Sequence, residues 1–175
     1  MGINSQPYRW FAIQTRSRHE KVVRNQLEMR NVEHFLPTKR RLSQWTDRKK
    51  EIEVPLFAGY CFARFSLEER LHVLQSQGVV RVVGSGGRPE PISDEEIESL
   101  RTLITNSSDY VSHPYLKKGT IVKVIRGPLQ GVKGRLVREA RSCRLVLSIN
   151  LIQRAVAIEI DAASVAPVSA HQDFC

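Results

Sequence analysis

The hydrophobic pattern of the chain changes near residue 110, and this change is the strongest constraint on its fold. Before it, helical stripes that start at capping residues alternate with strand-like runs. After it, only short β-rich runs separated by turns remain. Residues 107–118, between the two, are polar and contain a proline, as is typical of a linker. We therefore expect an α+β domain over residues 1–106, a linker over residues 107–118 and a small all-β domain over residues 119–175.

Three helices are predicted in the first domain. Each starts with a serine followed three positions later by a glutamate, which is the capping-box pattern, at Ser17, Ser66 and Ser93. Apolar residues then recur at helical spacing. The three stripes are Val23 and Leu27; Leu67, Leu71 and Leu74; and Ile97, Leu100 and Ile104. Strand-like runs between these helices predict a sheet layered with helices, close to the split βαβ plan.

Beyond the linker, five runs have strand character. They cover residues 120–126, 134–138, 144–150, 155–160 and 164–168. A small closed barrel of about five strands would remove the exposed edges that such a chain otherwise carries.

The richest apolar run, EVPLFAGYCFARF at residues 53–65, contains Pro55 and Gly59. Both residues weaken a central strand, because proline lacks a donor and glycine packs nothing. From Tyr60 onward the run alternates, and alternation puts successive side chains on opposite faces. One face carries Tyr60, Phe62 and Arg64, and the other carries Cys61, Ala63 and Phe65.

The chain is basic, with a formal charge of +9. This balance favours a polyanionic partner, usually nucleic acid. Its three cysteines are odd in number and widely spaced, which fits reduced thiols in a cytoplasmic protein. No apolar run approaches the roughly 20 residues of a membrane helix, so we expect no membrane partner.

No catalytic constellation stands out, and we expect neither an enzyme nor a cofactor. The histidines have no metal-ligand spacing with the cysteines, so no metal site is predicted. The glycine-rich segment GSGGRP at residues 84–89 lacks the lysine and the spacing of a phosphate-binding P-loop. It is interpreted as a flexible turn.

Two blocks of sequence resemble the NusG family of transcription elongation factors. The first comprises WFAIQT, FLPT, PLFAGYCF, GVVRVVG and PISDEEI, in this order over residues 10–97. The second comprises GTIVKV and GPLQGVKG at residues 119–134 and is similar to a KOW motif. A KOW motif alone is weak evidence, because ribosomal proteins carry it too. Both blocks in this order are specific.

The resemblance implies an N-terminal domain of the NGN type, with a mixed sheet and flanking helices, that binds the clamp helices of RNA polymerase. It also implies an SH3-like KOW barrel that recruits a ribosomal protein or the Rho terminator. In the matching motif, Pro55 and Gly59 flank a turn, although the family usually has proline at the position of Ala58. The residues expected to bind polymerase are Phe57, Tyr60, Phe62 and Ile97. The alternative for the three aromatic residues is ordinary core.

Nucleic-acid contacts are expected around the start of the first helix, at Arg16, Arg18, Lys21 and Arg24. Relatives use this region to touch non-template DNA, and a solvated helix face is the alternative. Specialised relatives carry an arginine where this chain has Gln77, so the resemblance does not extend to recognition of the same DNA element. The basic segment at residues 39–50 is interpreted as a solvated loop.

In the second domain, the NLIQR segment at residues 150–154 resembles the RfaH-like and UpxY-like antiterminator paralogues. Leu151 and Ile152 are the candidate contacts with the partner of the KOW domain, and barrel core is their alternative. We expect a monomer that acts as an elongation or antitermination factor. The alternatives are the general housekeeping factor and a KOW-containing RNA-binding translation protein.

Overall fold

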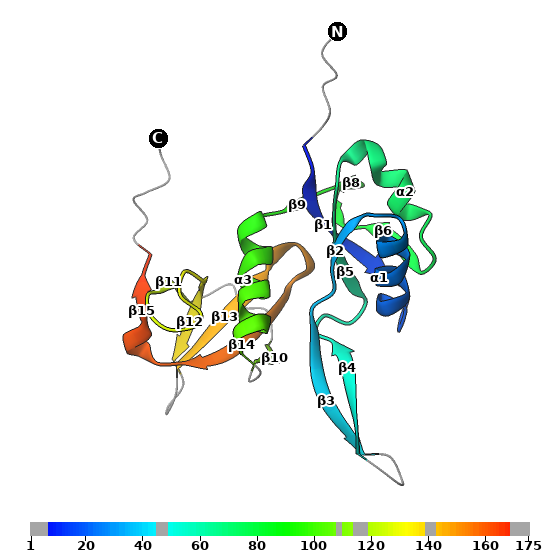
Figure 1. Ribbon diagram of the computed structural model, residues 1–175. Coiled ribbons are helices and arrows are strands. Elements are labelled where there is room, and N and C mark those ends of the chain that lie inside the picture. Colours follow the sequence, from blue (N-terminus) through cyan, green and yellow to red (C-terminus); the bar gives the residue numbers. More distant parts are fainter. Residues whose placement is uncertain (1–6, 45–48, 108–109, 114–118, 139–142, 169–175) are drawn as a thin grey trace. The chain divides into compact units, whose positions relative to one another are not determined.

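The computed structural model describes residues 7–44, 49–107, 110–113, 119–138 and 143–168. The chain divides into two compact units, Met1–Ile97 and Glu98–Cys175 (Figure 1). The division falls inside helix α3 (Asp94–Asn106), whereas the sequence placed the end of the first domain after that helix. Among the described residues, no helix has both the length and the apolar character needed to cross a bilayer.

The N-terminal unit is built on an antiparallel sheet. Its strands are β1 (Arg9–Thr15), β2 (Glu33–Phe35), β5 (Tyr60–Phe65) and β6 (Val79–Val82), in the order β2-β5-β1-β6, and the short β9 (Pro91–Ile92) also pairs with β1. β1 lies in the centre because its middle is apolar, and Trp10–Ile13 are all buried. The alternation predicted for β5 is confirmed. Cys61, Ala63 and Phe65 join the core cluster that also contains Val23 and Leu27 of α1 (Glu20–Met29).

The helix starts differ from the predicted capping boxes. Ser17 does not cap α1, because His19 occupies the N-cap position and no side chain caps it. Ser66 precedes the 3-10 turn η1 (Leu67–Glu69), again without a side-chain cap. Only Ser93 accepts the expected bond, from the Glu96 amide at 3.2 Å.

The predicted stripe of the second helix is also wrong. Leu67 is exposed, and Leu71 of α2 (Arg70–Leu74) is 66% exposed. The residue of this helix that enters the core is Val73. The reason is that α2 has only five residues and follows a 3-10 turn, whose residues do not follow the roughly 3.6-residue period of an α-helix. The predicted apolar residues therefore do not all face the core.

Two hairpins extend from the sheet. β3 (Thr38–Gln44) pairs with β4 (Lys49–Pro55), and Figure 1 shows this hairpin projecting from its unit. Most of β3 and the start of β4 lie in the segment at residues 39–50 that was expected to be a solvated loop. The side chains of Lys49 and Lys50, and all of residues 45–48, lie outside the described part. The second hairpin joins β7 (Gly84–Ser85) to β8 (Arg88–Pro89), in the segment expected to be a flexible turn.

Over the described residues, the C-terminal unit is an antiparallel sheet of six strands, and each of the five predicted runs overlaps one of them. The strands are β10 (Val111–His113), β11 (Thr120–Val124), β12 (Lys133–Arg138), β13 (Cys143–Ile149), β14 (Arg154–Ile160) and β15 (Val165–Pro167), in the order β10-β14-β13-β12-β11-β15. The 3-10 turns η2 (Asn150–Ile152) and η3 (Ala162–Ser164) flank β14. The additional strand β10 lies within the predicted linker. The fold class, an α+β unit followed by a small β unit, is confirmed.

Candidate functional site

The turn between β4 and β5 is fixed by hydrogen bonds on both sides of Gly59. The Gly59 amide donates to Oε1 of Glu20 at 2.7 Å, and the Gly59 carbonyl accepts from the Thr15 amide at 2.8 Å. Within the turn, the Tyr60 amide donates to the Phe57 carbonyl at 3.1 Å. Gly59 has φ +83°, a left-handed conformation that glycine adopts without steric cost. The predicted turn is therefore present, and it holds the start of β5 in one position.

Glu20 was not anticipated as part of this site. In the sequence it completes a capping box, but its buried carboxylate instead crosses from the start of α1 to the turn. The carboxylate and the amide lie 39 residues apart in sequence. The only sequence signal for this role of Glu20 was an acidic residue beside an apolar stripe. A local sequence pattern does not reveal a hydrogen bond between residues so far apart in the chain.

The aromatic residues expected to contact a partner differ in exposure. Tyr60 is half-buried, whereas Phe57 is 2% and Phe62 0% exposed. Phe57 meets Phe62 edge-on, with ring centroids 6.1 Å apart, and Phe35 stacks on Phe62 at 6.2 Å. Ile97 is fully buried as well. Of the four residues expected at the polymerase surface, Tyr60 is the one with an accessible ring.

The four basic residues near the start of α1 fall into two groups with different surroundings. Arg16 and Arg18 are exposed and make no ion pair with any described residue. Lys21 and Arg24 each approach Oε2 of Glu53, on β4, at 3.5 Å. Half of the expected nucleic-acid contacts therefore also connect α1 to the β3–β4 hairpin.

Glu53 is the acceptor for this connection. The hydroxyl of Thr38 donates to its Oε1 at 2.7 Å, and this bond, followed by the charges of Arg24 and Lys21, lowers the pKa of Glu53 below its ordinary value. Its carboxylate is therefore ionised at neutral pH, and it keeps the base of the hairpin next to α1.

Arg16 lies beside the loop that precedes β6. The Arg16 amide donates to the Gly78 carbonyl at 2.8 Å, and Gly78 packs against His19 so closely that a Cβ there would lie 3.0 Å from the His19 Cβ. The exposed Gln77 precedes this glycine. The structure thus brings together Arg16 and the position at which specialised relatives carry arginine.

The cysteines and histidines of the described residues form no cluster that could hold a metal ion. Cys61 is buried in the N-terminal core, and burial raises the pKa of its thiol to about 12. Cys143 is half-buried. Cys175 and His171 lie outside the described residues.

In the C-terminal unit, the predicted contact residues lie in η2. Leu151 is half-buried, and Ile152 is buried in the β unit. Gln153 ends this turn with φ +50°, in the left-handed region. Leu151 is therefore the member of the pair with apolar surface open to a partner.

An α+β unit with a fixed aromatic turn, followed by a small β unit, defines a two-module protein of the kind that the sequence blocks indicated. Residues 8–101 match the family model described as "Transcription termination factor nusG", and the chain belongs to the NusG family. The protein is thus a transcription factor and not an enzyme.

Similar proteins cover nearly the same length. The chain is 26% identical to the transcription termination/antitermination protein NusG of Helicobacter pylori over 164 residues, which is 86% of this chain and 93% of the relative. It is 28% identical to the protein of that name from Streptococcus pyogenes serotype M3, over 87% of this chain and 92% of the relative. A solved structure, "Domain interaction in Thermotoga maritima NusG", covers 93% of this chain and 98% of its own, with a TM-score of 0.51 and 20% identity, and shares the fold.

Proposed function

We propose that the protein is an elongation or antitermination factor whose N-terminal unit binds the clamp helices of RNA polymerase through a surface centred on Tyr60. The C-terminal unit recruits a second partner, a ribosomal protein or Rho, through a contact that includes Leu151. Arg16 and Arg18 contact non-template DNA. The proposal rests on family membership together with one structural observation, the fixed turn that presents Tyr60.

The turn supports this role because it removes the entropic cost of ordering the contact. Both polar backbone groups of Gly59 are already bonded, so Tyr60 is held in place before a partner arrives. Tyrosine is enriched among residues that carry interface energy, and helices commonly bind in apolar grooves. In this proposal Phe57 and Phe62 support the surface from within, and Tyr60 makes the direct contact.

The test is binding of the full-length protein to purified core RNA polymerase. Tyr60→Ala should weaken binding by at least about tenfold, since truncating an interface hot spot costs about 2 kcal/mol or more. Tyr8→Ala is the matched control, because Tyr8 is an exposed tyrosine of the same unit and hydrogen-bonds Glu69. Its affinity should stay within twofold of the wild type. Equal affinity of Tyr60→Ala and the wild type would refute the proposed surface.

A specialised antiterminator is our proposal for the finer role, supported by the NLIQR segment. A general factor is the second candidate, supported by the names of the relatives. Transcription across a Rho-dependent terminator separates them, since a general factor stimulates termination by Rho and a specialised one suppresses it. A translation protein that uses only its KOW module does not explain why residues 8–101 carry the family match.

A further inference from the structure

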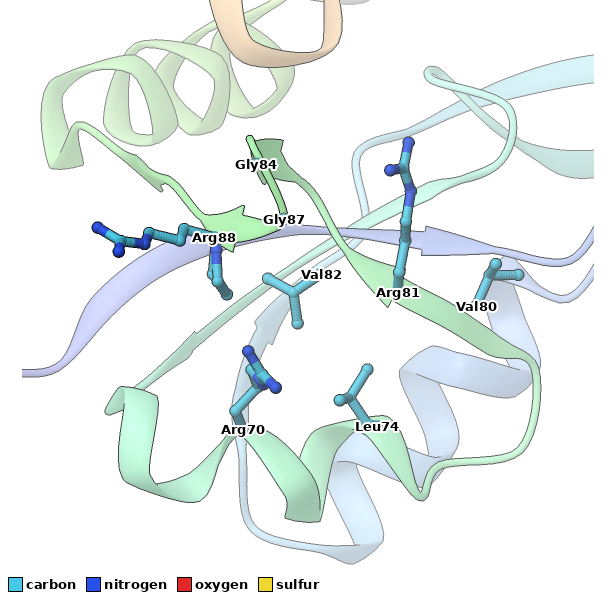
Figure 2. Close-up of a pocket in the computed structure, with 9 residues that line it drawn as sticks. Arg70, Leu74, Val80, Arg81, Val82, Gly84, Gly87 and Arg88 are labelled. Atoms are coloured by element: carbon cyan, nitrogen blue, oxygen red, sulfur yellow. The ribbon is translucent and has the colours of Figure 1, made fainter.

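A hollow of about 280 Å³ opens in the N-terminal unit between α2, β6 and the β7–β8 hairpin (Figure 2). Its lining, taken from the described part of the chain, includes no acidic side chain. Its floor is aliphatic, and Val80 on that floor is 52% exposed. The side chains that matter are three arginines and three aliphatic residues: Arg70, Arg81 and Arg88, and Leu74, Val80 and Val82.

The glycine-rich segment positions one of these arginines. A Cβ on Gly84 would lie 1.8 Å from the Arg88 carbonyl oxygen, so only glycine allows the two short strands to approach. Gly86 and Gly87 have φ +56° and +78° and form the tight turn between the strands. The segment therefore forms a defined hairpin that carries Arg88 at the rim of the hollow.

The arginines of the hollow are not neutralised. Nε of Arg81 donates to the neutral Oε1 of Gln14 at 2.7 Å. The side chains of Arg70 and Arg88 form no hydrogen bond or ion pair with any described residue, and Glu69, the acid next to Arg70 in sequence, accepts from the Tyr8 hydroxyl. Figure 2 shows Arg70 pointing from α2 toward β6 and Arg88 extending from the hairpin. Both residues line the hollow with guanidinium groups that the described protein leaves unused, and Figure 2 shows the side chain of Arg88 extending away from Arg70.

We propose that this hollow binds the backbone of a single-stranded nucleic acid, with Arg70 and Arg88 each ligating a phosphate. Guanidinium matches phosphate oxygens with two parallel hydrogen bonds, and the aliphatic floor gives a sugar or a base face a dry contact. The formal charge of +9 attracts a polyanion over a longer range. Such contacts add affinity without reading sequence. The site goes beyond the proposed function, because Tyr60, Arg16 and Arg18 do not contribute to it.

The experiment is a salt titration of the full-length protein with a short fluorescent single-stranded oligonucleotide. Each phosphate contact contributes about 0.7 to the slope of log affinity against log salt for single strands. Arg70→Ala/Arg88→Ala should therefore lower the slope by about 1.4, and the affinity gained between 1 M and 0.1 M salt should shrink about 25-fold.

The matched control is Arg126→Ala/Arg154→Ala, which removes two exposed arginines of the C-terminal unit and the same total charge. Its slope should equal that of the wild type. A second variant, Arg70→Lys/Arg88→Lys, keeps the charges and guards against a folding defect. It should keep the slope and lose affinity, since lysine cannot bind phosphate through a planar fork.

Three results would overturn the proposal. The first is an unchanged salt slope in both Arg70/Arg88 variants with no loss of affinity for the oligonucleotide. The second is an equal fall of the slope in the Arg126→Ala/Arg154→Ala control. The third is binding of a polyglutamate peptide that depends on Arg70 and Arg88 when oligonucleotide binding does not. Inorganic phosphate that shifts the amide NMR signals of Gly86 and Gly87, in competition with the oligonucleotide, would support it. Tyr60→Ala should leave oligonucleotide binding unchanged. The experiment therefore tests this proposal separately from the proposal that RNA polymerase binds the surface around Tyr60.

Discussion

Replacing Glu20 by alanine should destabilise the N-terminal unit more than the position of Glu20 on the first helical turn suggests. The substitution removes the acceptor of the Gly59 amide, which lies 2.7 Å from Oε1, and the Glu20 side chain is itself buried. A hydrogen bond to a charged group contributes about 1.5–3 kcal/mol, and a buried donor left unpaired costs about 1–3 kcal/mol. Since Gly59 is half-buried and water can partly replace the acceptor, we expect a loss of about 2 kcal/mol in the free energy of unfolding.

Two controls separate the hydrogen bond from other effects. Glu20→Gln keeps an oxygen that can accept from Gly59, and should lose about 1 kcal/mol or less, because a neutral bond is weaker. Glu28→Ala removes an exposed glutamate of the same helix, and surface substitutions of this kind usually change stability by less than about 0.5 kcal/mol.

Urea unfolding followed by tryptophan fluorescence measures these differences. Trp10 is buried in β1 and reports on the N-terminal unit, so the experiment is done in a Trp45→Phe background. Glu20→Ala should also lower the Tm by about 10 °C, using the scaling for a domain of about 100 residues. If Glu20→Ala unfolds at the same urea concentration as Glu28→Ala, the carboxylate does not hold the turn and the reasoning is refuted.

Two other predictions follow from the titrating groups. Because burial raises the pKa of Cys61 to about 12, its thiol stays protonated at pH 8, so iodoacetamide should label Cys143 in the native protein and Cys61 only in denaturant, as peptide mapping would show. Fast native labelling of Cys61 would contradict this. The pKa of Glu53 is lowered, first by the Thr38 hydroxyl, so its stabilising effect is present above the ordinary pKa of 4.5 and is lost as the pH falls through the lower folded value. Glu53→Gln should therefore flatten the fall in stability between neutral and acidic pH, and an unchanged acid profile would show that the carboxylate contributes nothing.

Strand alternation was the most reliable guide in the sequence. The two faces of β5 and the five runs of the C-terminal unit were predictable because side-chain direction alternates strictly along a strand. Turn chemistry was equally informative at Gly59, where the positive φ agrees with the expected turn.

Helix starts and hairpins were harder to predict. Ser17 and Glu20 satisfy the capping pattern, yet the Glu20 carboxylate accepts from the distant Gly59 amide and no side chain caps α1. Leu71 lies on the predicted stripe and is exposed, whereas Val73 is buried. Most of β3 and the start of β4 were interpreted as a loop because the charges of this segment hide the strand pattern. No local pattern reveals the hollow lined by Arg70 and Arg88, since α2 and β8 meet only in the folded chain.

The ion pairs between α1 and the base of the β3–β4 hairpin are sensitive to salt. Lys21 and Arg24 hold Glu53 through contacts of 3.5 Å between partly exposed groups, and such pairs weaken as ionic strength rises. A phosphate backbone that recruits these two cations competes directly with Glu53. Weakening the two pairs would loosen the contact between the hairpin and the first helix, while the hydrogen bond from Thr38 to Glu53 within the hairpin would remain.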